Sequence, residues 1–152
     1  MEETQNNSGE VTLEDYIAEH QTRWSAAVAE FSTKMKKFTD LIDLQYQIYS
    51  NRQNALDYYF SLLTKVSQLS RTYKEQYAAM YNSIKTGSQI RYSSEAAVNA
   101  QIASSLSELT YKIELLENHA KFMQETIKTI DSVIYAINNR IRIEELIQGL
   151  KK

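Results

Sequence analysis

Hydrophobic residues in the C-terminal half of the chain follow one another at alternating steps of four and three. Twelve positions make up this seam: Ile102, Leu106, Leu109, Ile113, Leu116, Ala120, Met123, Ile127, Ile130, Ile134, Ile137 and Ile141. An average step of about 3.5 residues is the spacing of a coiled-coil contact. The pattern therefore predicts a coiled-coil or oligomerisation helix over residues 95–148, followed by a short tail over 149–152.

A second helical pattern runs from Thr12 to about Ile84 without a strong breaker. Thr12 is of the type that begins a helix, and Asp15 stands where a capping box needs it. Two seams repeat every seven residues, interrupted by Gln45 and Arg52 in the first and by Ser70 in the second. The first contains Trp24, Phe31, Phe38, Tyr59, Val66, Tyr73 and Met80, and the second contains Val28, Met35, Ile42, Tyr49, Leu56, Leu63, Tyr77 and Ile84. We expect one long helix over 12–84, with the polar stretch near 50–54 as the place where it could break. Residues 1–11 are polar and aperiodic, which predicts a disordered acidic N-terminus.

Residues 85–94 carry the strongest connecting signal in the interior of the chain. Gly87 suits the position just after a helix, and Ser93 or Ser94 suits the start of the next one. The chain has no proline and three glycines in all. The predicted fold is therefore all-α, with long helices that form a coiled-coil-like hairpin or bundle joined by a basic loop.

Composition argues against several classes of protein. Without cysteine there is no disulfide or thiolate metal site. No apolar run approaches the roughly 20 residues that span a bilayer, and the acidic N-terminus is unlike a signal peptide, so we expect a soluble cytoplasmic protein. His20 and His119 lie on separate predicted helices without metal-ligand companions, and no phosphate loop or activated nucleophile is visible. We expect no enzyme, no metal and no cofactor.

The isoleucine-rich seam favours self-assembly, since isoleucine at both seam positions shifts coiled coils toward higher oligomers. An off-register cluster at the C-terminus (Ile143, Leu146, Ile147 and Leu150) indicates a further contact, either with another subunit or partner or with the N-terminal helix. We expect oligomerisation through Ile113, Leu116, Met123, Ile127, Ile130, Ile134, Ile137, Ile141 and Leu146.

Charge is uneven although the net charge is only −2. Residues 1–20 carry six acids and no base, whereas residues 65–92 carry five bases against Glu75 alone. Cations that track phosphates and aromatic faces that stack bases are how proteins bind single-stranded nucleic acid. The candidate DNA-binding residues are Lys65, Arg71, Lys74, Tyr77, Tyr81, Lys85, Arg91 and Tyr92. The tyrosines also continue a hydrophobic seam, so the alternative that they belong to the core stays open.

A set of residues in the C-terminal half has a distinctive spacing: Lys112, Ile113, Glu117, Phe122, Ile127, Lys128, Ile130, Tyr135, Ile137, Asn139, Ile141 and Gly149, with Met80, Tyr81, Lys85 and Gly87 upstream. This spacing resembles that of the UvsY-type recombination mediators of tailed phages. Glu144 and Glu145 depart from the family, which tends to have basic residues there.

This resemblance implies a homo-oligomeric ring without a cofactor, placed in the host-cell cytoplasm. It also implies binding of single-stranded DNA, to which Arg71 and Lys74 contribute, and contacts with a RecA-like recombinase and a single-strand-binding protein. The alternative is a structural coiled-coil assembly or adaptor protein without nucleic-acid binding. A membrane-surface bundle is disfavoured, because the chain lacks a helix face dense in lysine and arginine.

Overall fold

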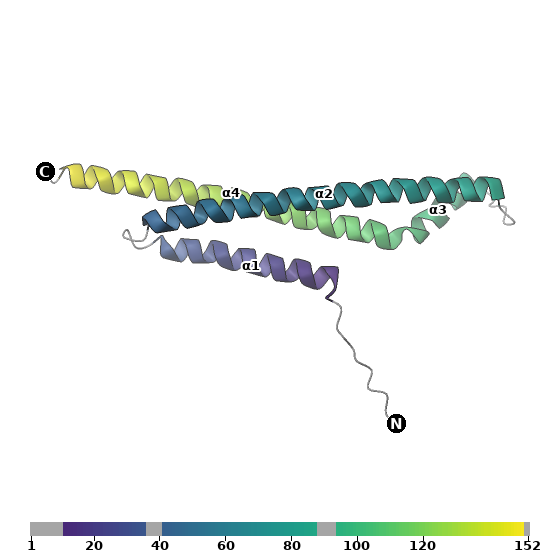
Figure 1. Cartoon of the computed structure of the whole chain (residues 1–152), viewed down its shortest axis with the longest axis horizontal. Helices are drawn as coiled ribbons and strands as arrows, with labels where there is room; N and C mark the ends of the chain where they lie inside the picture. The colour runs from purple at the N-terminus through teal and green to yellow at the C-terminus, as the bar shows by residue number, and fades with distance from the viewer. Residues whose placement is uncertain (1–10, 36–40, 88–93, 151–152) are drawn as a thin grey trace, which may run out of the picture.

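The computed structural model describes residues 11–35, 41–87 and 94–150, and these fold into four helices with no strand. In chain order they are α1 (Leu13–Lys34), α2 (Leu41–Gly87), α3 (Glu95–Ser105) and α4 (Ser107–Leu150). Figure 1 shows an elongated molecule in which α2 and α4 run antiparallel along most of its length. The expectation of an all-α fold is confirmed for this part of the chain.

The predicted helix over 12–84 is wrong as a single element. α1 ends at Lys34, α2 begins at Leu41, and residues 50–54 lie inside an unbroken α2. α1 lies beside α4 and runs in the same direction (Figure 1). Near the start of α1, Leu13 and Tyr111 of α4 line the same pocket. Just after the end of α1, the carbonyl oxygen of Met35 accepts a hydrogen bond from Arg140 of α4. Because α1 and α2 are separate helices, α1 can pack on α4 and cover its apolar surface. A single straight helix over 12–84 would leave that surface in water.

The predicted helix over 95–148 is also divided. Leu106 ends α3 with φ −101° and ψ 8°, and α4 then continues to Leu150. Side-chain hydroxyls compete for backbone carbonyls on both sides of this point: Ser105 donates to the carbonyl of Gln101, and Thr110 donates to that of Leu106. Such local hydrogen bonds offer the backbone an alternative to regular helix and often bend it.

The starts of two helices are confirmed. At the start of α1, the Thr12 hydroxyl accepts a hydrogen bond from the backbone N–H of Asp15, and the Asp15 carboxylate accepts one from the backbone N–H of Thr12. At the start of α3, the Ser94 hydroxyl accepts a hydrogen bond from the backbone N–H of Ala97. Gly87 belongs to α2 as its last residue, without the positive φ expected after a helix end. The predicted disordered segment falls on residues 1–10 and most of the predicted loop on 88–93; both lie outside the described residues.

The main core lies where α1, α2 and α4 meet. None of the twelve seam positions is exposed: Met123, Ile130 and Ile137 have no accessible surface, and the others are buried or half-buried. On α2 the buried side chains are Leu41, Leu44, Ile48, Ala55 and Leu62. A smaller core at the other end joins Val98, Ile102 and Leu106 to half-buried residues of α2. The C-terminal seam is therefore occupied by helices of its own chain.

Candidate nucleic-acid interface

Three of the predicted DNA-binding bases lie on one side of α2. Lys74 follows Arg71 by three residues and Lys85 follows Lys74 by eleven, which is close to whole numbers of helical turns. All three side chains are exposed, and they span about 21 Å at 1.5 Å per residue. We call Arg71, Lys74 and Lys85 the basic side of α2.

Charge on this side is only weakly neutralised. Arg71 Nε lies 2.8 Å from Glu75 Oε1, with the two side chains 82% and 62% exposed. Exposed pairs of this kind contribute roughly 0–1 kcal/mol, so Arg71 can exchange its carboxylate for a phosphate at little cost. Lys74 has no ion-pair partner among the described residues, and Lys85 Nζ lies 5.3 Å from the centre of the Tyr81 ring.

Lys65 is not part of this group. Nine residues, or about two and a half helical turns, separate it from Lys74, so it emerges on the opposite side of α2. Arg91 and Tyr92 fall outside the described residues. The structure thus brings together three of the five predicted bases.

The tyrosines beside the basic side are half-buried against α3. The Tyr77 hydroxyl donates to Asn99 Oδ1 at 2.8 Å, and the Tyr81 hydroxyl donates to Glu95 Oε1 at 2.7 Å. Their rings are nearly parallel, with centres 6.4 Å apart. Both residues therefore attach α3 to α2, which agrees with the alternative that they belong to the core.

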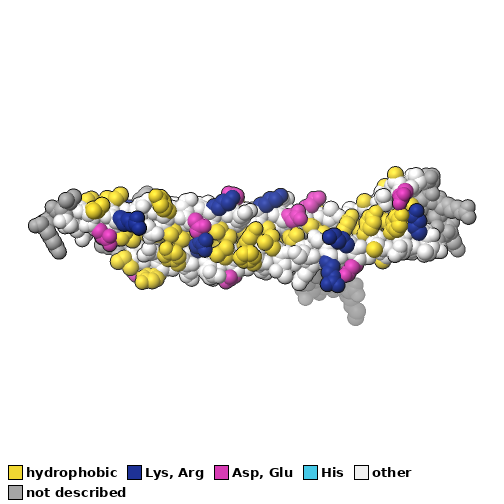
Figure 2. Space-filling model, turned by 90° about the horizontal axis from the view of Figure 1, so that it is seen from above, with side chains coloured by type: hydrophobic (Ala, Val, Ile, Leu, Met, Phe, Trp, Pro, Cys, Tyr) yellow, Lys and Arg dark blue, Asp and Glu magenta, His cyan; other side chains and the backbone are white. Residues whose placement is uncertain are grey.

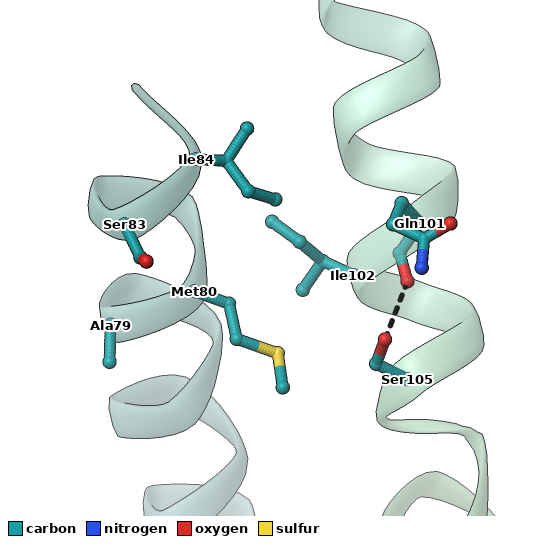
Figure 3. A pocket seen from close by; sticks show the side chains of 7 residues that line it. All are labelled: Ala79, Met80, Ser83, Ile84, Gln101, Ile102 and Ser105. Atoms are coloured by element: carbon teal, nitrogen blue, oxygen red, sulfur yellow. Dashed lines mark hydrogen bonds between the residues drawn. The ribbon is translucent and has the colours of Figure 1, made fainter. Parts of the chain in front are cut away.

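A groove runs between α2 and α3 at this end of the molecule. In Figure 3 Met80 and Ile84 point from α2 toward Ile102 of α3. The groove encloses about 450 Å³, and Ala79, Ser83, Gln101 and Ser105 complete its lining. Because none of these side chains is charged, the groove offers nothing that would hold a phosphate.

Two histidines that the sequence places on separate helices meet in the core. The ring centres of His20 (α1) and His119 (α4) are 6.3 Å apart, and Tyr58 of α2 stacks on His20 at 4.8 Å. The Tyr58 hydroxyl shares a hydrogen bond with His119 Nε2 at 3.0 Å. His119 has no exposed surface.

This cluster favours a neutral His119. The Nδ1 atoms of both rings are buried without a hydrogen-bond partner among the described residues. Burial, reinforced by the nearby His20, lowers the pKa of His119. Burial also raises the pKa of Tyr58, and Tyr16 adds to that effect. Among the described residues no carboxylate contributes to the shift at His119, and burial disfavours the charged imidazolium there.

We expect the stability of the fold to decrease as the pH falls below about 6.5, the pKa of an unperturbed histidine. In that range His119 binds a proton in the unfolded chain but stays neutral in the folded chain. The free energy of unfolding therefore decreases with falling pH until the pH is below the lowered pKa of folded His119. Thermal melts followed by circular dichroism between about pH 7.5 and 5.5 measure this. His119→Phe should show a smaller drop; an equal drop in both proteins would contradict the assignment.

The predicted oligomerisation residues are mostly internal. Leu116, Met123, Ile127, Ile130 and Ile137 are buried in the main core of the single chain, and Ile113, Ile134 and Ile141 are half-buried. Leu146 is exposed, together with Ile143 and Ile147. The end of α4 extends beyond the start of α2 (Figure 1). The seam was expected to join subunits, but the folded chain fills it because α1 and α2 pack against it.

Apolar surface nevertheless remains uncovered. Figure 2 shows apolar side chains in a broken band along one face, with charged side chains of both signs between them. The exposed apolar side chains of α2 include Ile42, Tyr46, Tyr49 and Phe60. Exposed apolar surface gathered in this way marks contact sites more often than scattered single residues do.

Neither a metal-binding cluster nor a similar protein adds to the description of this interface. Within the described ranges there is no cluster of three or more histidine, cysteine or acidic side chains that could hold a metal ion, and no helix is both long and apolar enough to cross a bilayer. Comparisons with protein-family models, with curated proteins and with solved structures found no match.

Proposed function

We propose that this protein binds single-stranded DNA along the basic side of α2. The observation that carries the proposal is the exposure of Arg71, Lys74 and Lys85 along about 21 Å of one helix side, with only Arg71 paired to a carboxylate among the described residues. Cationic side chains at this spacing can follow a flexible phosphate backbone, and binding then releases counterions from the DNA.

In this proposal the tyrosines have a supporting role. Tyr77 and Tyr81 hold α3 against α2, and the Tyr81 ring keeps Lys85 close to the helix through a cation–π contact. Affinity then comes chiefly from phosphate contacts, which predicts little preference among DNA sequences. A strong preference would indicate base recognition that these three bases do not supply.

One copy of a basic side with three cations binds DNA weakly, and we propose that a homo-oligomer multiplies it. Several linked sites on one strand gain avidity without any new contact. The resemblance to the UvsY-type mediators supports a role for this oligomer in DNA recombination, where it would help to load a RecA-like recombinase onto DNA in place of single-strand-binding protein. No cofactor is needed for such a role.

Binding of a fluorescent oligonucleotide at low salt tests the proposal. The proposal predicts a rise in anisotropy when the protein is added to single-stranded DNA. An oligomer that leaves the anisotropy unchanged would contradict it and would favour the structural assembly or adaptor protein instead.

A further inference from the structure

A second heptad stripe lies on α2, beside the one that faces the core. Seven residues follow one another at alternating steps of four and three: Ile42, Tyr46, Tyr49, Gln53, Leu56, Phe60 and Leu63. Ile42, Tyr46 and Phe60 are 63%, 74% and 59% exposed, and Leu56 alone also packs against the main core. Three heptads of this spacing form the contact side of a coiled coil. We call these seven residues the outer stripe.

The outer stripe is distinct from the core side of the same helix. The buried side chains of α2 are Leu41, Leu44, Ile48, Ala55 and Leu62, none of which belongs to the stripe. Large aromatic and aliphatic side chains left in water at heptad spacing are costly, at about 25 cal/mol for each Å² that a partner helix could cover. A partner helix of matching length would therefore stabilise the protein by covering the stripe.

We infer that a second copy of this chain covers the outer stripe, with the two α2 helices parallel and in register. Gln53 lies near the middle of the stripe as its one polar member. In a parallel pair it meets the partner subunit's Gln53, and an amide side chain both donates and accepts, so the two can satisfy each other. A single polar residue at such a position is a known determinant of coiled-coil register.

The charges beside the stripe favour the same arrangement. Arg52 and Asp57 lie five residues apart on its two flanks, where a parallel coiled coil forms its interhelical ion pairs. Each Arg52 would then face Asp57 of the partner subunit. An antiparallel pair centred on Gln53 would instead bring Arg52 close to the partner's Arg52, and like charges at that position oppose pairing.

The existing contacts of Arg52 leave room for this pair. Its Nε and Nη2 atoms bind the two carboxylate oxygens of Asp131, at 2.5 and 3.4 Å. The Nη1 atom has no acceptor among the described residues, and a guanidinium carries enough donors for two carboxylates. Asp57 is exposed and accepts from Gln53 of its own helix at 2.8 Å, which leaves its second carboxylate oxygen for the partner.

The proposed function gives this pairing its biological purpose, because a homo-oligomer multiplies the DNA-binding sites. The pairing itself does not depend on DNA binding. The outer stripe requires a partner helix whether or not the basic side binds DNA. Pairing can therefore be tested without DNA, and a chain that pairs but binds no oligonucleotide would overturn the proposed function while supporting the inference.

Cysteine cross-linking tests both the surface and its direction, because the chain has no cysteine of its own. Tyr46→Cys and Phe60→Cys, each prepared alone, should form a disulfide-linked dimer in high yield under mild oxidation. A parallel, in-register pair places each residue opposite its own copy, within the distance that a disulfide spans. Asn54→Cys, exposed on the same helix but off the stripe, is the matched control and should give little dimer.

Two results would overturn the inference. Disulfide formation only when Tyr46→Cys and Phe60→Cys are mixed would show an antiparallel pair. Absence of dimer from each variant and from the mixture would exclude pairing through the stripe. As an independent check, the double variant Tyr46→Glu/Phe60→Glu should lower the mass measured by light scattering without reducing helix content, since both side chains are exposed in the single chain. An unchanged mass would also count against the inference.

Discussion

The substitution Ile130→Asp is expected to unfold the protein. Ile130 has no accessible surface and lies in the core shared by α1, α2 and α4. A carboxylate there would lose its hydration without gaining a partner, which costs about 4 kcal/mol or more. Total stabilities of about 5–15 kcal/mol leave little margin for such a loss. Circular dichroism should show a large drop in melting temperature, or little helix at room temperature.

Gln124→Asp is the matched control, because it adds the same charge to an exposed position of the same helix. It should melt close to the unchanged protein. If Ile130→Asp kept its helix content and melting temperature but lost only mass in light scattering, then Ile130 would face another subunit and the arrangement of the core would be wrong.

The double substitution Arg71→Ala/Lys74→Ala should weaken binding of single-stranded DNA by about tenfold or more at low salt. It removes two cations from every basic side, and an oligomer repeats the loss in each subunit that touches the strand. The slope of log affinity against log salt should also become shallower, by about 0.7 for each phosphate contact removed. Fluorescence anisotropy with a labelled oligonucleotide measures both quantities.

Lys121→Ala/Lys128→Ala changes the net charge equally, on the exposed surface of α4. Affinity should fall much less in this control than in the α2 variant. Equal losses in the two variants would mean that overall charge, rather than the basic side of α2, governs binding.

Local periodicity was enough to predict the helices and the buried side of α4. Every step of four or three from Ile102 to Ile141 keeps the side chain on one face, and that face is the one the structure buries. The helix starts at Thr12 and Ser94 were also readable, because a capping side chain acts within three residues.

The change of direction between α1 and α2 could not be predicted from local periodicity. Phe31 and Phe38 continue the seven-residue spacing from Trp24, and Tyr59 resumes it after Gln45 and Arg52. These two polar positions interrupt the seam, but they do not show that the chain reverses. Lys34 in the last turn of α1 is a weak signal, since a cation favours a helix C-terminus. The reversal is decided by packing of α1 on α4, which is a long-range contact.

The same long-range contacts decide which side of α2 is buried. Ile42 and Tyr49 repeat as regularly as Leu41 and Ile48, and only the position of α4 shows which pair faces inward. His20 and His119 likewise meet because α1 folds back, and no local spacing connects them. By contrast, helix geometry alone would have separated Lys65 from Lys74, because nine residues turn a helix through about half a circle.

The salt dependence of DNA binding tests the central claim most directly. Affinity of the unaltered protein for a labelled single-stranded oligonucleotide is measured from low to high salt by anisotropy, with the oligomer mass checked by light scattering at each end. Binding through the basic side of α2 predicts a steep linear fall of log affinity with log salt, since several phosphates are neutralised at once. A folded oligomer that fails to bind at low salt, or that binds equally well at every salt concentration, would contradict the account.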